Sequence, residues 1–164
     1  MVYIRTKKIN DNLYAYLVES FKTKKGSRQK VKQYLGRVYK IDSKNYSNDV
    51  NVRGRDRNSF LLRMILPEFL VLGFKEKNND EYIYKNFIFN SKKFSLVKKT
   101  KSKTLKDAII SLNNGYLCTF TLQRLIDFKK TNDIRKDAKL LAKMFLETGI
   151  EISQEDFISF YQIG

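Results

Sequence analysis

The first forty residues alternate between two kinds of side chain, and this alternation constrains the fold more than any other feature of the sequence. Three runs show it, at 2–9, 13–21 and 28–35. Asn10-Asp11-Asn12 separates the first two runs, and a loop containing Gly26 separates the last two. Successive side chains of a strand point to opposite faces, and Asn, Asp and Gly favour tight turns. The pattern therefore predicts a three-stranded antiparallel meander that ends at Gly36.

The same alternation assigns the side chains of the meander to two faces. One face is apolar, and we expect it to be buried: Val2, Ile4, Leu13, Ala15, Leu17, Val31 and Leu35. The other face interleaves basic residues with tyrosines: Tyr3, Arg5, Lys7, Tyr14, Tyr16, Arg28, Lys30, Lys32 and Tyr34. Basic side chains release counterions from phosphates, and tyrosine rings stack on bases, so this face is predicted to bind nucleic acid. The alternative is a solvated sheet surface, because exposed strands use Lys to avoid pairing with other chains.

The distribution of charge supports a polyanion partner. The 164 residues include 33 Lys and Arg against 17 Asp and Glu, a net charge of +16. Residues 1–40 are net +9, 41–70 are net +1 and 71–103 are net +6, whereas 104–164 are net zero. A genome biased towards Lys is the alternative explanation, but it would not remove the excess from the last third. We expect a basic, β-rich nucleic-acid-binding domain over 1–103 and a neutral helical domain over 104–164.

The rest of the chain predicts more strands and then helices. Residues 41–58 are polar and are expected to form a loop, before an apolar helix that Ser59 caps and Pro67 breaks or restarts. Residues 81–90 are predicted as one strand, with a hairpin partner over 92–97. Capping residues and apolar spacing then predict helices over 104–112, 121–130 and 134–148 and after Ser153. The fold class is α+β: an N-terminal antiparallel β-meander and a second hairpin, followed by a C-terminal helical domain.

Two further basic clusters are candidates for phosphate contact. Arg53, Arg55 and Arg57 surround Gly54, where guanidinium groups could chelate phosphate oxygens while the glycine lets the backbone approach. A flexible solvated loop is an equally good interpretation of this short pattern. The lysines of residues 98–103 offer charge alone, and they equally fit a solubilising loop.

The sequence offers little for catalysis, cofactors or membranes. It has no His, and Cys118 is its only cysteine, so His-based nucleophile activation and thiolate zinc sites are excluded. We predict no enzyme activity, no metal site and no cofactor; a small carboxylate-metal nuclease using Asp80 and Glu81 is the less favoured alternative. A lone cysteine, no signal peptide and no long apolar segment predict a cytoplasmic protein that is not in the membrane.

Residues 3–36 resemble the N-terminal β-module of DDE-type insertion-sequence transposases and their short prokaryotic relatives. The matching features are Tyr3-Ile4-Arg5, Tyr16-Leu17-Val18-Glu19-Ser20, Arg28-Gln29 and Tyr34-Leu35-Gly36. In that setting the module precedes a catalytic domain, and the resemblance implies contact with DNA ends. Residues 37–164 show no DDE catalytic domain, so the resemblance implies binding without transposition chemistry.

Together these features predict a non-catalytic nucleic-acid-binding protein, with DNA favoured, that contacts phosphates and bases through its sheet face. The alternative is an RNA- or ribosome-associated factor, which the same charge and tyrosines would suit. The predicted partner is DNA or RNA, and the helical domain leaves room for a protein partner or self-association.

Overall fold

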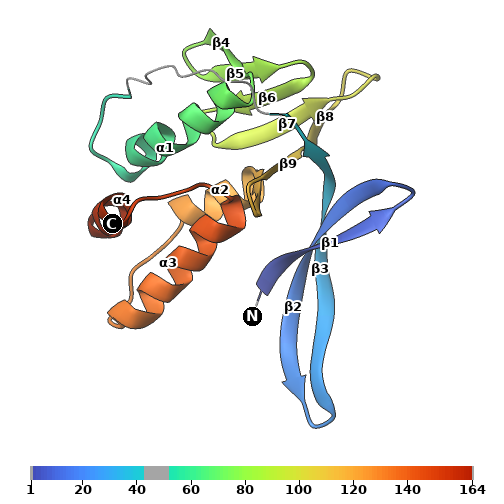
Figure 1. Ribbon diagram of the computed structural model, residues 1–164, viewed down its shortest axis with the longest axis vertical. Coiled ribbons are helices and arrows are strands. Elements are labelled where there is room, and N and C mark those ends of the chain that lie inside the picture. The colour runs from blue at the N-terminus through green and yellow to red at the C-terminus, as the bar shows by residue number, and fades with distance from the viewer. Residues whose placement is uncertain (1, 43–51, 164) are drawn as a thin grey trace.

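The computed structural model of the protein describes residues 2–42 and 52–163. In these residues ten strands form two five-stranded sheets, and four helices pack beside them (Figure 1). This is the α+β fold that the sequence predicts. The segment 43–51, part of the loop expected over 41–58, lies outside the described residues.

The predicted meander is confirmed as three antiparallel strands of the first sheet: β1 (Val2–Ile9), β2 (Asn12–Thr23) and β3 (Gly26–Lys40). Asn10 and Asp11 form the turn between β1 and β2, and their φ angles of 46° and 60° suit a two-residue hairpin loop. β3 does not end at Gly36, as predicted, but continues to Lys40. These last residues pair with a strand from much later in the chain, which carries β3 into the body of the protein.

That later strand corrects the helix predicted over 104–112. Residues 105–118 form three strands instead: β8 (Leu105–Asp107), β9 (Ile109–Leu112) and β10 (Gly115–Cys118). β9 runs parallel to β3, and β10 completes the sheet order β1-β2-β3-β9-β10. Ile109 and Ile110 are both buried although they point to opposite faces, so this short strand is apolar on both sides. A run of that kind cannot be separated from a buried helix by spacing alone. Asn113 and Asn114 form the turn of the β9–β10 hairpin rather than a helix stop, and Gly115 begins β10.

The second sheet is an antiparallel meander of β4 (Lys75–Asn78), β5 (Glu81–Tyr84), β6 (Phe87–Asn90), β7 (Ser95–Lys99) and β8. The single strand predicted over 81–90 is wrong, because Lys85 and Asn86 form a turn that folds it into a hairpin. Lys85 adopts a positive φ of 51°, and because lysine does not favour this conformation the sequence did not indicate the turn. The hairpin partner predicted at 92–97 begins and ends slightly later, as β7.

One helix, α1 (Arg57–Val71), covers the second sheet (Figure 1). It begins earlier than predicted, because the side chain of Asp56 rather than Ser59 caps it and accepts a hydrogen bond from the Ser59 amide at 3.1 Å. Pro67 lies inside the helix without ending it. The ring removes one backbone hydrogen bond, but the flanking turn is held by packing, with the Phe69 ring stacked 4.2 Å from that of Phe89.

The C-terminal helices are α2 (Thr119–Ile126), α3 (Ile134–Thr148) and α4 (Gln154–Gln162). The helix predicted over 121–130 begins two residues earlier and ends four residues earlier, as α2, whereas α3 and α4 follow their capping signals. Asp133 caps α3, Gly149 ends it at φ 79°, and Ser153 caps α4, all as predicted. These helices share one large apolar core with α1 and the second sheet. A smaller core of Ala15, Val38, Ile109 and Cys118 lies on the inner side of the first sheet.

Strand pairing crosses the position where we expect a domain boundary. β7 and β8 lie on either side of residue 103 and pair with each other, and β9 pairs with β3. Both sheets therefore combine residues from 1–103 with residues from 104–164. Among the described residues, no helix has the length and apolar character needed to cross a membrane.

Candidate nucleic-acid interface

Two β-bulges in the β2–β3 hairpin decide which side chains share a face. Ala15 pairs with Gly36, but Tyr16 pairs with Tyr34, so Leu35 is passed over. Leu17 pairs with Gln33, but Val18 pairs with Val31, and Lys32 is passed over in turn. Each extra residue inverts the alternation of β3 relative to its partner strand.

Six predicted site residues share one face of the meander, which we call the tyrosine face: five lie on β1 and β2, which pair without a bulge, and the bulges of β3 add Tyr34. Arg5 lies opposite Tyr16, Lys7 lies opposite Tyr14, and Tyr16 lies opposite Tyr34. The face thus holds Tyr3, Arg5, Lys7, Tyr14, Tyr16 and Tyr34 as predicted, and also Gln29 and Arg37, which are not among the predicted site residues. Gly36 is the sequence signal that could have identified Arg37. A glycine within a strand often marks a bulge, and a bulge between Tyr34 and Arg37 puts both side chains on one face.

The remaining basic residues of the hairpin lie elsewhere, which corrects their predicted place beside the tyrosines. Arg28 pairs with Phe21 and Lys30 pairs with Glu19, so both point to the opposite face. Lys32 sits in the second bulge, and its ammonium group forms an ion pair with Glu19 at 3.0 Å. Val31, predicted to be in the core, is instead 59% exposed on the tyrosine face. Val31 pairs with Val18, and the bulge at Lys32 lets Val31 and Tyr34 share a face although three positions separate them; no residue type in 28–35 indicates that bulge.

A groove of about 480 Å³ runs along the tyrosine face. Above it a polar bridge links β1 to β3: the Gln29 amide donates to the Tyr3 hydroxyl at 2.5 Å, and Arg5 donates to the Gln29 carbonyl at 2.5 Å. Val18, on β2 between these residues, is only 2% exposed. The groove combines fixed polar groups with an apolar floor; its lining is Arg5, Thr6, Lys7, Tyr16, Val18, Gln29 and Val31.

Beside the groove three tyrosine rings form a cluster. The Tyr34 ring centroid lies 5.4 Å from that of Tyr16 and 6.3 Å from that of Tyr14, and Tyr34 remains 54% exposed. Partial burial, followed by the neighbouring phenols, raises the pKa of Tyr34 above its ordinary value of 10.0. The phenol is therefore neutral at physiological pH and can offer a ring plane and a hydroxyl.

The basic character of the face continues towards the second sheet. The Arg37 guanidinium lies 5.3 Å from the centre of the Tyr39 ring, and the Lys98 ammonium lies 3.9 Å from the same ring. Lys98 is the first residue of the lysine run that the sequence predicts as a loop, and it belongs instead to β7. These cation–π contacts hold two positive charges at the upper end of the tyrosine face.

The arginine cluster around Gly54 does not act as one unit. Arg53 and Arg55 are exposed in the segment before α1, but Arg57 is the first residue of that helix and is partly buried. Its guanidinium donates to the carbonyl oxygens of Ile126 and Phe128, and burial lowers its pKa from the ordinary value of an arginine. Arg57 therefore joins α1 to the end of α2, and its part in a phosphate clamp stays a prediction.

Asp80 and Glu81, the candidate metal ligands of the nuclease alternative, lie far from the tyrosine face. Asp80 and Glu81 belong to the β4–β5 hairpin, at the opposite end of the molecule from the β2–β3 hairpin (Figure 1). Glu81 accepts hydrogen bonds from Lys77 and Asn78, its neighbours in that hairpin. In the part of the chain that the structure describes, no three Asp, Glu or Cys side chains are placed to hold a metal ion.

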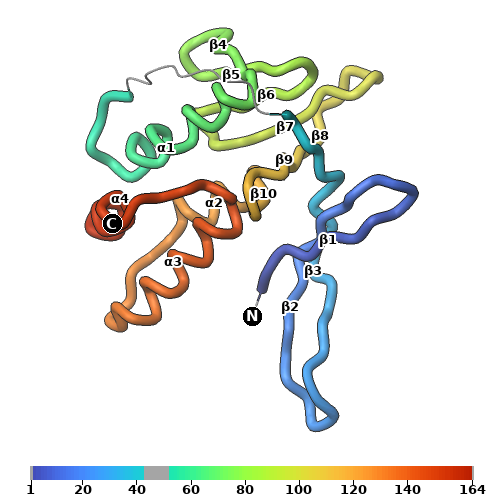
Figure 2. Tube along the Cα trace, viewed as in Figure 1, coloured from blue at the N-terminus to red at the C-terminus, as the bar shows by residue number. Residues whose placement is uncertain are grey.

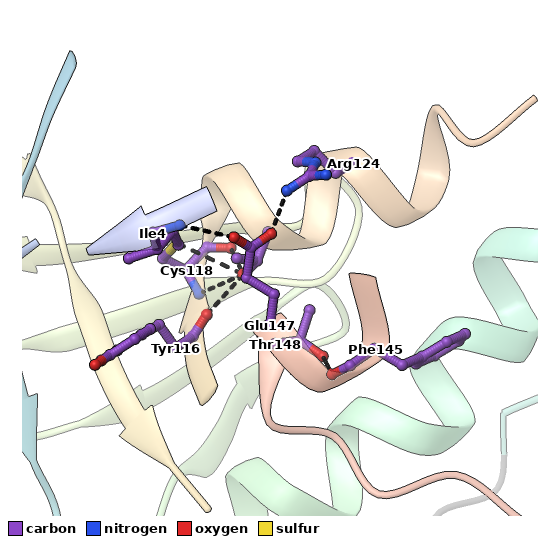
Figure 3. A network of polar contacts seen from close by, with 8 residues as sticks. Ile4, Tyr116, Cys118, Arg124, Phe145, Glu147 and Thr148 are labelled. Carbon is purple, nitrogen blue, oxygen red and sulfur yellow. Dashed lines mark hydrogen bonds and ion pairs between the residues drawn. The ribbon is translucent and has the colours of Figure 1, made fainter. Parts of the chain in front are cut away.

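A largely buried carboxylate attaches the meander to the helices. Glu147, on α3, accepts a hydrogen bond from the backbone amide of Ile4 at 2.8 Å and forms an ion pair with Arg124 of α2 (Figure 3). Both Glu147 and Arg124 have mostly buried side chains. This contact fixes where β1, and with it Arg5 and Lys7, stands relative to the body of the protein.

Comparisons with known proteins leave the identity of the chain open. No protein-family model, no curated protein and no solved structure matches it. The resemblance of residues 3–36 to a transposase module therefore stays a prediction.

Proposed function

We propose that the protein binds nucleic acid through its tyrosine face, with DNA favoured, and acts by contact rather than by catalysis. The observation that carries the proposal is the strand register, which places Arg5, Lys7 and Arg37 among three clustered tyrosines beside a groove of about 480 Å³. Basic groups there can neutralise phosphates, and exposed rings can stack on bases or sugars.

The charge distribution and the resemblance give further support. The excess of +16 lies in residues 1–103, where repulsion between like charges would be relieved by a polyanion. The resemblance of residues 3–36 implies DNA-end contact, and we place the protein in the cytoplasm, where its lone cysteine stays reduced.

Neutralising the charges of the tyrosine face tests the proposal. The double variant Arg5→Gln/Lys7→Gln should weaken binding to a labelled DNA duplex and flatten the log–log salt slope by roughly 0.9 for each phosphate that is no longer neutralised. The matched control Lys8→Gln/Lys40→Gln removes the same charge from neighbouring exposed positions on the other face. Equal losses in the two variants would reject the tyrosine face as the binding surface.

The same titrations separate the alternatives. Tighter binding of structured RNA than of duplex DNA at equal salt would favour an RNA- or ribosome-associated factor. Magnesium-dependent cleavage that disappears in Asp80→Asn or Glu81→Gln would contradict the non-catalytic interpretation and favour the nuclease.

A further inference from the structure

The β2–β3 hairpin continues well beyond the strand that supports it. Among the described residues, the last β1 pair is Val2 with Glu19, and from Ser20 to Gln29 β2 and β3 pair only with each other. We call residues 20–29 the arm; in the trace it projects away from the rest of the molecule and ends in a free tip (Figure 2). Three steps of about 3.3 Å, from Ser20 to Thr23, make it roughly 10 Å long before the turn.

The arm carries positive charge and no compensating acid. Lys22, Lys24, Lys25 and Arg28 are all exposed, and residues 20–29 contain no Asp or Glu. Among the contacts of the described residues, none of these four side chains forms an ion pair. The Phe21 side chain, opposite Arg28, is 43% exposed. The arm therefore presents four exposed cations and one exposed aromatic ring.

Solubility alone does not account for this arrangement. Lysines on an exposed strand prevent pairing with other chains, and this would explain Lys22, Lys24 and Lys25. Solubility would not explain why Phe21 is exposed, nor why a two-stranded ribbon is kept without a third strand to stabilise the pair. A ribbon of this kind gains stability when a partner covers both strands and neutralises their charge.

The dimensions of the arm match one class of nucleic acid. Two strands lie about 4.8 Å apart, and the major groove of B-form DNA, about 12 Å wide and 8.5 Å deep, admits a two-stranded β-ribbon. The major groove of A-form RNA is deep and narrow and excludes it. We propose that the arm inserts into the major groove of duplex DNA; this rests on the proposed function and names its substrate.

The position of the arm is compatible with simultaneous use of the tyrosine face. Gln29 and Val31, at the root of the arm, line the groove of that face together with Arg5 and Lys7. A duplex held by the arm would thus place its flanking phosphates near these charges. The arm would supply preference for B-form geometry, and the tyrosine face would supply further contacts along the strand.

The test compares duplexes of one sequence made of DNA and of RNA, using the full chain at fixed salt. The wild-type protein should bind the DNA duplex roughly tenfold more tightly than the RNA duplex. The variant Lys22→Gln/Lys24→Gln/Lys25→Gln should lose most of that preference, with its DNA salt slope flattened by roughly 0.9 for each phosphate that is no longer neutralised. The control Lys129→Gln/Arg135→Gln/Lys139→Gln removes equal charge from exposed positions in or near α3 and should keep the preference.

The outcomes distinguish this inference from the proposed function. Binding without preference for DNA duplex, or an arm variant that behaves like the control, would overturn the insertion of the arm and leave the tyrosine face standing. No binding of any nucleic acid by the wild type would overturn both. A drug that occupies the minor groove should leave the affinity unchanged, and competition by it would reject major-groove contact even if the arm variant were unstable.

Discussion

At the scale of single residues, Tyr34 is the side chain that we expect to contribute most to stacking on bases. Its ring lies beside Tyr14 and Tyr16, it is half exposed, and its phenol is neutral at physiological pH. Stacking on a base is worth about 1–3 kcal/mol. We expect Tyr34→Leu to weaken binding of single-stranded DNA roughly tenfold, measured by fluorescence anisotropy, and Tyr34→Phe to preserve it. Equal affinity of the Leu and Phe variants would contradict a stacking role.

Glu147 is the residue that positions β1. Removing its carboxylate leaves the Ile4 amide without its acceptor and the partly buried Arg124 without its counter-ion. We expect Glu147→Ala to lower the free energy of unfolding by about 2–3 kcal/mol, as losses of hydrogen bonds to charged groups do. Chemical denaturation measures this, and amide exchange should show faster opening at Ile4. Glu147→Gln keeps an acceptor and should lose less; equal losses would mean that the backbone contact adds nothing.

Asp137 links stability to acid pH. Burial by itself would raise its pKa, but hydrogen bonds from the amide and hydroxyl of Thr131 and the hydroxyl of Tyr161 outweigh burial and lower it below 3.8. The ionised carboxylate thus stabilises the fold above that pH, and the contribution is lost as the pH falls through the folded-state pKa. Asp137→Asn should be less stable than wild type at pH 6, and this gap in melting temperature should narrow below pH 4. A gap independent of pH would contradict the assignment.

At the scale of elements, the C-terminal end of α3 packs on the β9–β10 hairpin backbone to backbone. A Cβ atom on Gly115 would lie 2.2 Å from the amide nitrogen of Gly149 and 2.6 Å from the Leu146 carbonyl oxygen. Neither backbone group can move without separating the helix from the hairpin. Gly115→Ala should therefore cost about 2–3 kcal/mol of stability, as overpacking does.

A glycine in the arm provides the control for this prediction. Gly26 adopts a φ of 111°, but a Cβ atom there would meet nothing within 4 Å. Gly26→Ala should cost about 1–2 kcal/mol through backbone strain alone. Thermal melts of both variants decide the comparison, and a larger loss in Gly26→Ala would show that the contact between α3 and the hairpin yields easily.

At the scale of the whole molecule, the two sheets bind the halves of the chain together. β8 supplies an edge strand to the second sheet, and β9 and β10 supply two strands to the first. We expect fragments 1–103 and 104–164 to be largely unfolded when each is alone, by circular dichroism, because each leaves paired strands and a shared apolar core incomplete. Mixing or co-expressing them should restore structure. A folded, monomeric fragment 104–164 would support an independent helical domain instead.

Local signals in the sequence were enough to predict the meander, the caps of α3 and α4 and the asymmetry of charge. Asn10-Asp11, Asp133, Gly149 and Ser153 act through their own backbone and near neighbours, so their effect can be predicted without the fold. The basic, tyrosine-rich character of residues 3–37 is likewise a property of the chain itself.

Only the tertiary structure decided which of those side chains stand together. The bulges at Lys32 and Leu35 bring Tyr34 to the face of Tyr14 and Tyr16 and leave Arg28 and Lys30 on the other face, because register depends on pairing between strands. Ile109 and Ile110 are both buried, and a short apolar run of this kind fits a buried strand as well as a buried helix. Pairing with β3 decides for the strand. These outcomes depend on partners distant in sequence, which no local preference encodes.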